Sequence, residues 1–166
     1  LEHEVWFCTR SSGIVGSVWM ETVPEKHIRS YKVDTDIDKG TVCVEFDEVE
    51  GAGEVKVTTN LPKDFTCWTP ETPQLYTFTA TYGEDVVKGY FGMRKFEKRK
   101  DAKGVLRFFL NHKPIFLLGT LDQGWWPDGL LTPPSEEAMV FDILTLKDCG
   151  YNMMRKHIKV EPRRYY

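Results

Sequence analysis

The sequence predicts a mainly β protein in which an antiparallel β-sandwich precedes a single βαβ unit. Two observations predict this order. Between residues 26 and 93, apolar and polar residues alternate in short runs separated by glycine-containing turns, as they do in half-buried antiparallel strands. From residue 113 onward, an apolar run, a helical pattern and a second apolar run follow one another, which is typical of two strands connected by a helix.

The strand alternation is clearest in the second half of the predicted sandwich. From Tyr76 to Tyr82, every second residue is aromatic or alanine, so these side chains would share the buried face of a long strand. Residues 86–91 predict the next strand, across a turn at 83–85 that begins with glycine. Apolar side chains also alternate over residues 42–46. Six or seven strands of this kind would make a sandwich.

Two prolines interrupt the pattern before its longest strand. Pro70 and Pro73 have no backbone N–H to donate to a strand ladder, so their segment predicts a bulge or a crossing between sheets. The neighbouring Trp68 is expected to pack in a core or between domains. The alternative is a platform for a sugar ring, because an aromatic face packs well against the C–H face of a pyranose.

The βαβ unit is predicted from three consecutive signals. Residues 115–118 are a continuous apolar run, typical of a strand covered on both faces and closed here by Gly119. A helix then begins at residues 133–135, carries two glutamates in its first turn, and ends at Gly150. Residues 151–154 begin the second strand. The helix stripe expected to face the sheet comprises Met139, Ile143 and Leu146.

Three motifs in this order resemble glycoside hydrolase family 2, which includes β-galactosidases, β-glucuronidases and β-mannosidases. The segment LDQGWWPDG after KPIFLLG, with NMMRKHIKVEP beyond the helix, resembles the opening of that family's catalytic (β/α)8 barrel. The segment CWTPETPQLYTFTATY is similar to its immunoglobulin-like domain, and SSGIVGSVWMETVP is similar to the last strand of its sugar-binding jelly roll.

The resemblance implies a division into three domains. The end of the jelly roll would occupy residues 1–23, with short strands at 5–7 and 17–21. The immunoglobulin-like β-sandwich would occupy residues 24–97, and the incomplete βαβ start of the (β/α)8 barrel residues 98–166.

A complete barrel takes ~250 residues, so the chain resembles a fragment of a larger enzyme. An incomplete barrel exposes both flanks of its sheet. We therefore expect the last segment to pack on the preceding domain, to pair with a second copy in a homo-oligomer, or to be partly disordered.

The implied activity of the parent protein is that of a retaining exo-glycosidase, β-galactosidase-like, which hydrolyses terminal O-glycosidic bonds of a carbohydrate substrate. Such enzymes need two carboxyl groups ~5–5.5 Å apart, and the family places them on glutamates after the fourth and seventh barrel strands. The first of these glutamates follows an asparagine, and this chain has no Asn-Glu dipeptide. We therefore expect no catalytic residue in this chain and no activity from the chain alone.

Two other function classes are weighed against this one. An immunoglobulin-like sandwich with an aromatic loop could be a non-catalytic module that binds carbohydrate or protein. An unrelated enzyme is disfavoured because the sequence has neither a G-x-S-x-G elbow nor a phosphate-cradling glycine loop.

Candidate sugar-binding residues lie after the two barrel strands, because active sites of such barrels form at the carboxyl ends of strands. Their mixture of polar and aromatic groups suits a ligand that offers both hydroxyls and an apolar ring face. The candidates are Asp122, Gln123, Trp125, Trp126, Asp128, Arg155 and His157.

Several candidates also have a purely structural interpretation. Asp122 could accept hydrogen bonds from the tight glycine loop, and Asp128 before Gly129 is an ordinary turn pair. Arg155 follows an apolar strand and is expected to form a structural ion pair, because an isolated buried charge is costly. His157 could be a satisfied strand-end histidine, and its position also resembles that of the histidine in a family segment that lines the sugar site.

Charge and hydropathy exclude other partners. A net charge of −3 and a pI near 5.8 give no reason to expect nucleic acid, and we interpret residues 94–103 as a solvated linker. No apolar run approaches the ~20 residues that span a bilayer, so no membrane partner is expected. The N-terminus shows no export signal, and the compartment stays open between cytoplasmic and periplasmic or secreted.

The cysteines predict neither a metal site nor a disulfide framework. The four thiols lie far apart, with no C-x-x-C pair and no histidine at ligand spacing. We expect buried free thiols, with a disulfide between Cys43 and Cys67 as the alternative. No metal and no cofactor are predicted.

Overall fold

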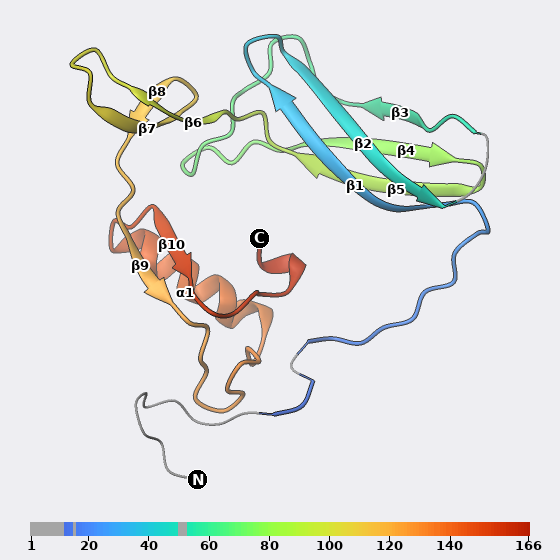
Figure 1. Ribbon diagram of the computed structural model, residues 1–166. Coiled ribbons are helices and arrows are strands. Elements are labelled where there is room, and N and C mark those ends of the chain that lie inside the picture. Colours follow the sequence, from blue (N-terminus) through green and yellow to red (C-terminus); the bar gives the residue numbers. More distant parts are fainter. Residues whose placement is uncertain (1–11, 15, 50–52) are drawn as a thin grey trace. The chain divides into compact units, whose positions relative to one another are not determined.

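The computed structural model describes residues 12–14, 16–49 and 53–166 (Figure 1). They form two compact units, which we describe separately. The first unit runs from Glu21 to Phe116, and the second contains Leu117–Tyr166. Residues 98–116, which the sequence assigned to the barrel domain, therefore lie in the same compact unit as the sandwich.

The sandwich consists of two antiparallel sheets, which confirms the predicted fold class (Figure 1). One sheet pairs two strands and the other has three in the order β3-β4-β5. The described residues thus give five sandwich strands, where six or seven were expected. The strands are β1 (His27–Asp36), β2 (Thr41–Val49), β3 (Lys56–Thr59), β4 (Tyr76–Tyr82) and β5 (Asp85–Phe91).

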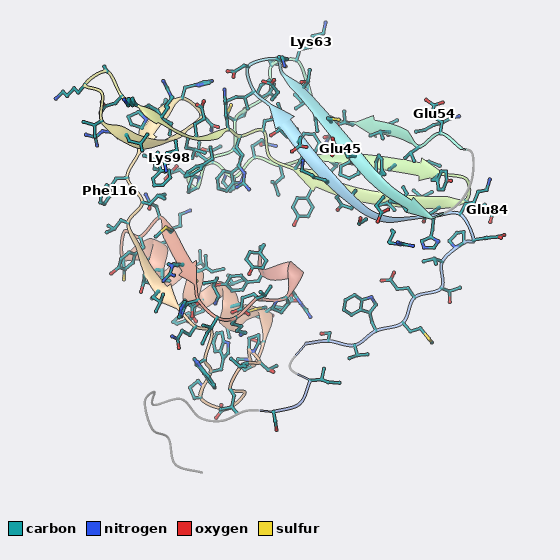
Figure 2. The ribbon with its side chains drawn as sticks, in the orientation of Figure 1. Glu45, Glu54, Lys63, Glu84, Lys98 and Phe116 are labelled. Carbon is teal, nitrogen blue, oxygen red and sulfur yellow. The ribbon has the colours of Figure 1, made fainter. Side chains whose placement is uncertain are left out.

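The core of the sandwich lies between the two sheets. Alternate residues of β4 are buried, as predicted, and Phe78 and Tyr82 are 1% exposed. The apolar side chains of β2 at 42, 44 and 46 pack on this cluster. Gly89 on β5 leaves space for the Phe78 ring, since a Cβ there would lie 2.4 Å from Phe78 Cε1. Charged side chains such as those of Lys63 and Glu84 point outward (Figure 2).

The proline segment connects two neighbouring strands of one sheet. Because β3 and β4 pair directly, the segment is neither a bulge nor a crossing between sheets, and this expectation was wrong. Trp68 is half-buried, and the Arg94 guanidinium lies 4.6 Å from its ring centroid. Gly92 lies against the same ring, since a Cβ there would be 3.0 Å from Trp68 Cβ.

A third antiparallel sheet follows the sandwich, where a solvated linker was expected. It consists of β6 (Phe96–Lys100), β7 (Leu106–Leu110) and β8 (Lys113–Ile115), in that order. Half of the basic run at 94–103 is therefore strand β6, whose backbone pairs with β7 and whose side chains are mostly exposed. His112 Nε2 lies 2.7 Å from Asp38 Oδ1 and ties this sheet to the β1–β2 turn.

The second unit is a βαβ arrangement. Its strands β9 (Gly119–Asp122) and β10 (Met153–Lys156) pair directly and in parallel, and helix α1 (Glu136–Asp148) connects them in the sequence. Gly119 begins strand β9 and does not close a strand at 115–118, so the expected strand was misplaced. Glycine is needed at position 119 because the backbones of β9 and β10 come close together there. A Cβ on Gly119 would lie 2.3 Å from the Met153 carbonyl oxygen. Phe116, inside the apolar run, is 79% exposed.

The predicted ends of the helix are confirmed. Ser135 is the N-cap, and its hydroxyl accepts a hydrogen bond from the Ala138 N–H at 3.2 Å. Gly150 follows the helix with a φ of +86°, a conformation that glycine adopts without strain. The predicted stripe is only partly buried, because Met139 is 6% exposed but Ile143 is 39% exposed. Within the described residues, no helix has the length and apolarity needed to cross a bilayer.

Other expectations concern the N-terminal part and the cysteines. Residues 17–21 form no strand, which differs from the expectation, and residues 5–7 lie outside the described residues. Cys43, Cys67 and Cys149 are free, as expected, yet Cys43 and Cys149 are exposed. The outer face of strand β2 explains the exposure of Cys43. Cys8 also lies outside the described residues.

Candidate functional site

The carboxyl ends of β9 and β10 bring together two candidates from separate segments. The parallel register places Arg155 opposite Leu121 and Lys156 opposite Asp122. One residue further, the His157 backbone N–H donates to the Asp122 carbonyl at 2.8 Å. Asp122 and His157 therefore lie side by side at one edge of the strand pair.

Asp122 closes the loop that follows β9. Its Oδ1 accepts a hydrogen bond from the Gly124 N–H at 2.6 Å, which is the structural role that the sequence suggested. Its Oδ2 accepts a hydrogen bond from Lys156 Nζ. Both oxygens of this carboxylate thus have partners within the same unit.

Glu161 is the buried charged residue of the described chain, with a side chain only 3% exposed. Its Oε1 lies 2.6 Å from Lys156 Nζ, and its Oε2 lies 3.0 Å from Lys159 Nζ. Lys159 Nζ also donates to the Gly124 carbonyl at 3.0 Å. Two lysines and two carboxylates therefore form one charge-balanced group, which we call the lysine–carboxylate cluster: Asp122, Lys156, Lys159 and Glu161.

The electrostatics of the cluster favour the charged forms of Asp122 and Lys156. Burial alone would raise the pKa of Asp122, but hydrogen bonds from Lys156 and the Gly124 N–H outweigh it, so the pKa lies below its usual 3.8. Burial alone would lower the pKa of Lys156, but hydrogen bonds to Asp122 and Glu161 raise it above 10.5. Burial raises the pKa of Tyr165, whose ring lies 5.0 Å from Lys156 Nζ.

Gln123 and His157 meet at the edge of this cluster. Gln123 Nε2 lies 3.3 Å from His157 Nδ1, and both side chains are partly buried. If the amide donates to Nδ1, the proton of the neutral imidazole resides on Nε2. The structure therefore brings together three of the predicted residues, Asp122, Gln123 and His157.

The tryptophan loop continues directly from Gly124. Trp126 and Leu130 exchange backbone hydrogen bonds of 2.7 and 3.1 Å, which closes a tight loop with Asp128 exposed in it. The indole N–H groups of Trp125 and Trp126 are buried without an acceptor among the described residues. A buried donor without a partner costs about 1–3 kcal/mol, so both need an acceptor that these residues do not supply.

Among the residues that the structure describes, Arg155 does not form the ion pair expected of it. Its side chain is exposed, and in the described part of the chain the ion pairs of this strand are made by Lys156. Successive strand residues point to opposite faces, so the inward position falls to Lys156. Lys159 and Glu161 were not among the residues predicted from the sequence. The signal that could have indicated them is the segment KHIKVE at 156–161, in which two lysines and a glutamate lie close together at the end of the strand.

The site offers groups for polar recognition of a ligand. Within the described residues, no group of three or more His, Cys, Asp or Glu side chains is arranged to hold a metal ion. The available groups are an imidazole, an amide and two indoles, which suit hydrogen bonding and stacking with a hydroxylated ring.

Comparisons with known proteins agree with the fold. The family model described as "Glycosyl hydrolases family 2" matches residues 27–94, and no curated protein sequence matches the chain. A β-glucuronidase from Faecalibacterium prausnitzii superposes with a TM-score of 0.71 at 21% identity, over 86% of this chain and 26% of that one.

Two further solved structures show the same likeness. A β-glucuronidase from an uncultured Clostridium species has a TM-score of 0.71 at 20% identity, over 86% of this chain and 27% of that one. A family 2 β-galacturonidase from Eisenbergiella tayi, bound to galacturonate, has a TM-score of 0.66 at 20% identity, over 86% of this chain and 30% of that one. The chain thus spans less than a third of the length of these enzymes.

Proposed function

Residues 27–94 belong to glycosyl hydrolases family 2, and from this premise we propose that the chain is part of a retaining exo-glycosidase. The parent protein would hydrolyse the terminal O-glycosidic bond of a β-linked sugar. The chain would supply the sandwich that precedes the catalytic (β/α)8 barrel and the first βαβ unit of that barrel.

One observation carries this proposal. After the segment that matches the family 2 model and the β6–β8 sheet, two parallel strands end at the same edge and present Asp122, Gln123 and His157 together. In barrels of parallel strands, the substrate site forms at this edge. The side chains there would bind sugar hydroxyls, and Trp125 and Trp126 would offer ring faces and indole donors.

The two carboxylates of the lysine–carboxylate cluster are unsuited to catalysis. Asp122 and Glu161 share the ammonium of Lys156, and a retaining mechanism does need two nearby carboxyl groups. However, the pKa of Asp122 is lowered, so this group would not hold the proton of a general acid near neutral pH. Glu161 is buried, which keeps substrate from its oxygens. We therefore assign catalysis to residues outside this chain.

The similar structures guide the choice of sugar. They are named as β-glucuronidases and a β-galacturonidase, so β-uronides are the first substrates to test, followed by the β-galactosides that the sequence motifs suggested. The cluster lysines are already neutralised by Asp122 and Glu161. Recognition of a sugar carboxylate is therefore left to other parts of the parent protein.

The test starts from the gene. The reading frame around this chain is sequenced, and both the chain and the longest encoded polypeptide are assayed with 4-nitrophenyl β-D-glucuronide, galacturonide, galactoside and mannoside. We expect activity only in the longer polypeptide, with retention of the β-anomer by NMR. His157→Ala in that polypeptide should reduce kcat/KM, while His27→Ala in the sandwich serves as the matched control.

Two results would contradict the proposal. One is a reading frame that ends at Tyr166 together with binding of a sugar or protein by the chain, which would make it a non-catalytic module. The other is an active longer polypeptide in which His157→Ala and His27→Ala behave alike, which would remove the strand edge from the substrate site.

A further inference from the structure

The loop between Asp122 and Trp126 is held at two points by one buried side chain. Glu161 contacts Lys156 through Oε1 at 2.6 Å and Lys159 through Oε2 at 3.0 Å. Each lysine then reaches the loop: Lys156 binds the Asp122 carboxylate, and Lys159 donates to the Gly124 carbonyl at 3.0 Å. Glu161 is thus the common partner of both loop contacts.

The packing around Gly124 shows how closely the loop depends on this arrangement. Gly124 is buried and has a φ of +67°. A Cβ at this position would lie 2.6 Å from Glu161 Oε1 and 2.8 Å from Lys159 Nζ. The loop backbone therefore rests directly on the charged ends of the cluster.

The residues proposed to meet the sugar are attached to these fixed points. Trp125 follows Gly124 in the chain, and the His157 backbone donates to the Asp122 carbonyl at 2.8 Å. Gln123, between the two anchored residues, reaches His157 Nδ1 at 3.3 Å. A shift of the loop would move all three side chains together.

We propose that Glu161 is a positioning residue that sets the loop Asp122–Trp126 and the imidazole of His157 through Lys156 and Lys159. Its carboxylate touches neither substrate nor reacting atoms. The part of this inference that concerns sugar recognition rests on the proposed function, whereas the part that concerns loop position does not.

Charge balance and loop position can be separated by two variants. Glu161→Gln keeps the side-chain shape but leaves two lysines opposite the single carboxylate of Asp122. Adding Lys159→Met restores the balance between Lys156 and Asp122, yet it removes the hydrogen bond to the Gly124 carbonyl. A merely stabilising Glu161 predicts that Glu161→Gln loses stability but keeps the wild-type loop signals. A positioning Glu161 predicts that the loop signals shift in Glu161→Gln, and that the double variant recovers stability but not those signals.

The experiment uses the full chain and the matched control Glu136→Gln, which removes an exposed carboxylate that pairs with Arg164 in the same unit. Urea unfolding gives stability. NMR gives the amide signal of Gly124, the indole signals of Trp125 and Trp126, and the imidazole signals of His157. Saturation-transfer NMR with methyl β-D-glucuronide and methyl β-D-galactoside reports sugar binding.

We expect shifted loop and imidazole signals in Glu161→Gln and in the double variant, and unchanged signals in the control. Wild-type loop signals in either variant, or full recovery of those signals in the double variant, would overturn the inference. Should the single variant not fold, wild-type loop signals in the double variant would still overturn the inference. Absence of sugar binding by the wild-type chain would count against the proposed function, while the loop signals still decide the positioning role.

Discussion

The sandwich and the βαβ unit are stabilised by different interactions. The sandwich buries Phe78, Tyr82 and Met93 almost completely between two sheets. In the βαβ unit, α1 leaves Phe141 68% exposed, and the buried contacts at the strand ends are ion pairs. Apolar burial stabilises in proportion to area, whereas a buried ion pair gives little net stability but is costly to break. The stability of the βαβ unit should therefore depend on the charges of its side chains and on pH, and that of the sandwich on the volumes of its core side chains.

The largest expected effect is a cavity in the sandwich. Phe78→Ala removes a ring that is 1% exposed and should cost about 3–5 kcal/mol of unfolding free energy. Urea unfolding followed by the amide signals of β4 measures this. The matched control Phe141→Ala, on the exposed face of α1, should change stability by about 0.5 kcal/mol or less. Equal losses would mean that the helix is as well packed as the sandwich.

The next effect tests the ion pairs of the βαβ unit. Lys156→Met keeps the apolar stem but leaves Asp122 and Glu161 without their shared ammonium. We expect a loss of about 2–3 kcal/mol, seen in the amide signals of β10 during urea unfolding, with those of β4 unchanged. A neutral or stabilising result would show that apolar packing can replace the cluster.

Features that depend on local sequence were predictable in both regions, whereas a feature that depends on a contact between distant segments was not. Strand β4 and the ends of α1 were predictable because local rules decide them: alternation for the strand, and Ser135 and Gly150 for the helix. The start of β9 was not, because the apolar run at 115–118 is a stronger local signal than Gly119. That glycine is needed for its close approach to Met153, which is a contact between segments.

The proximity of Asp122 and His157 was predictable from the sequence, whereas the charged groups beside them were not. Parallel strand ends place Asp122 and His157 together, and the structure shows their backbone hydrogen bond. Whether Arg155 or Lys156 points inward depends on the strand register, since a shift by one residue reverses the faces. Lys159 and Glu161 follow the strand, where no periodicity specifies side-chain direction.

A smaller effect is the pH dependence of the βαβ unit. The pKa of Asp122 is lowered in the folded chain, so its contribution is present above its ordinary value of 3.8 and is lost as the pH falls through the folded value. The pKa of Lys156 is raised, so its contribution is present below 10.5 and is lost as the pH rises through the folded value. The β10 signals should therefore weaken at both extremes. Lys156→Met should flatten this profile, and an unchanged acid limb in that variant would assign the dependence to other groups.

The smallest effect concerns an ion pair of the same unit that lies in solvent. Arg164 contacts Glu136, and their side chains are 57% and 62% exposed. Water screens such a pair, so Arg164→Ala should cost about 0.2–1 kcal/mol and lose most of that effect in high salt. Urea unfolding followed by the amide signals of β10, at low and at high salt, measures the stability loss of Arg164→Ala and that of Lys156→Met for comparison. If the two variants cost the same, burial would not distinguish the cluster from the surface pair, and the stability of the βαβ unit would have to come from its few apolar contacts around Met139.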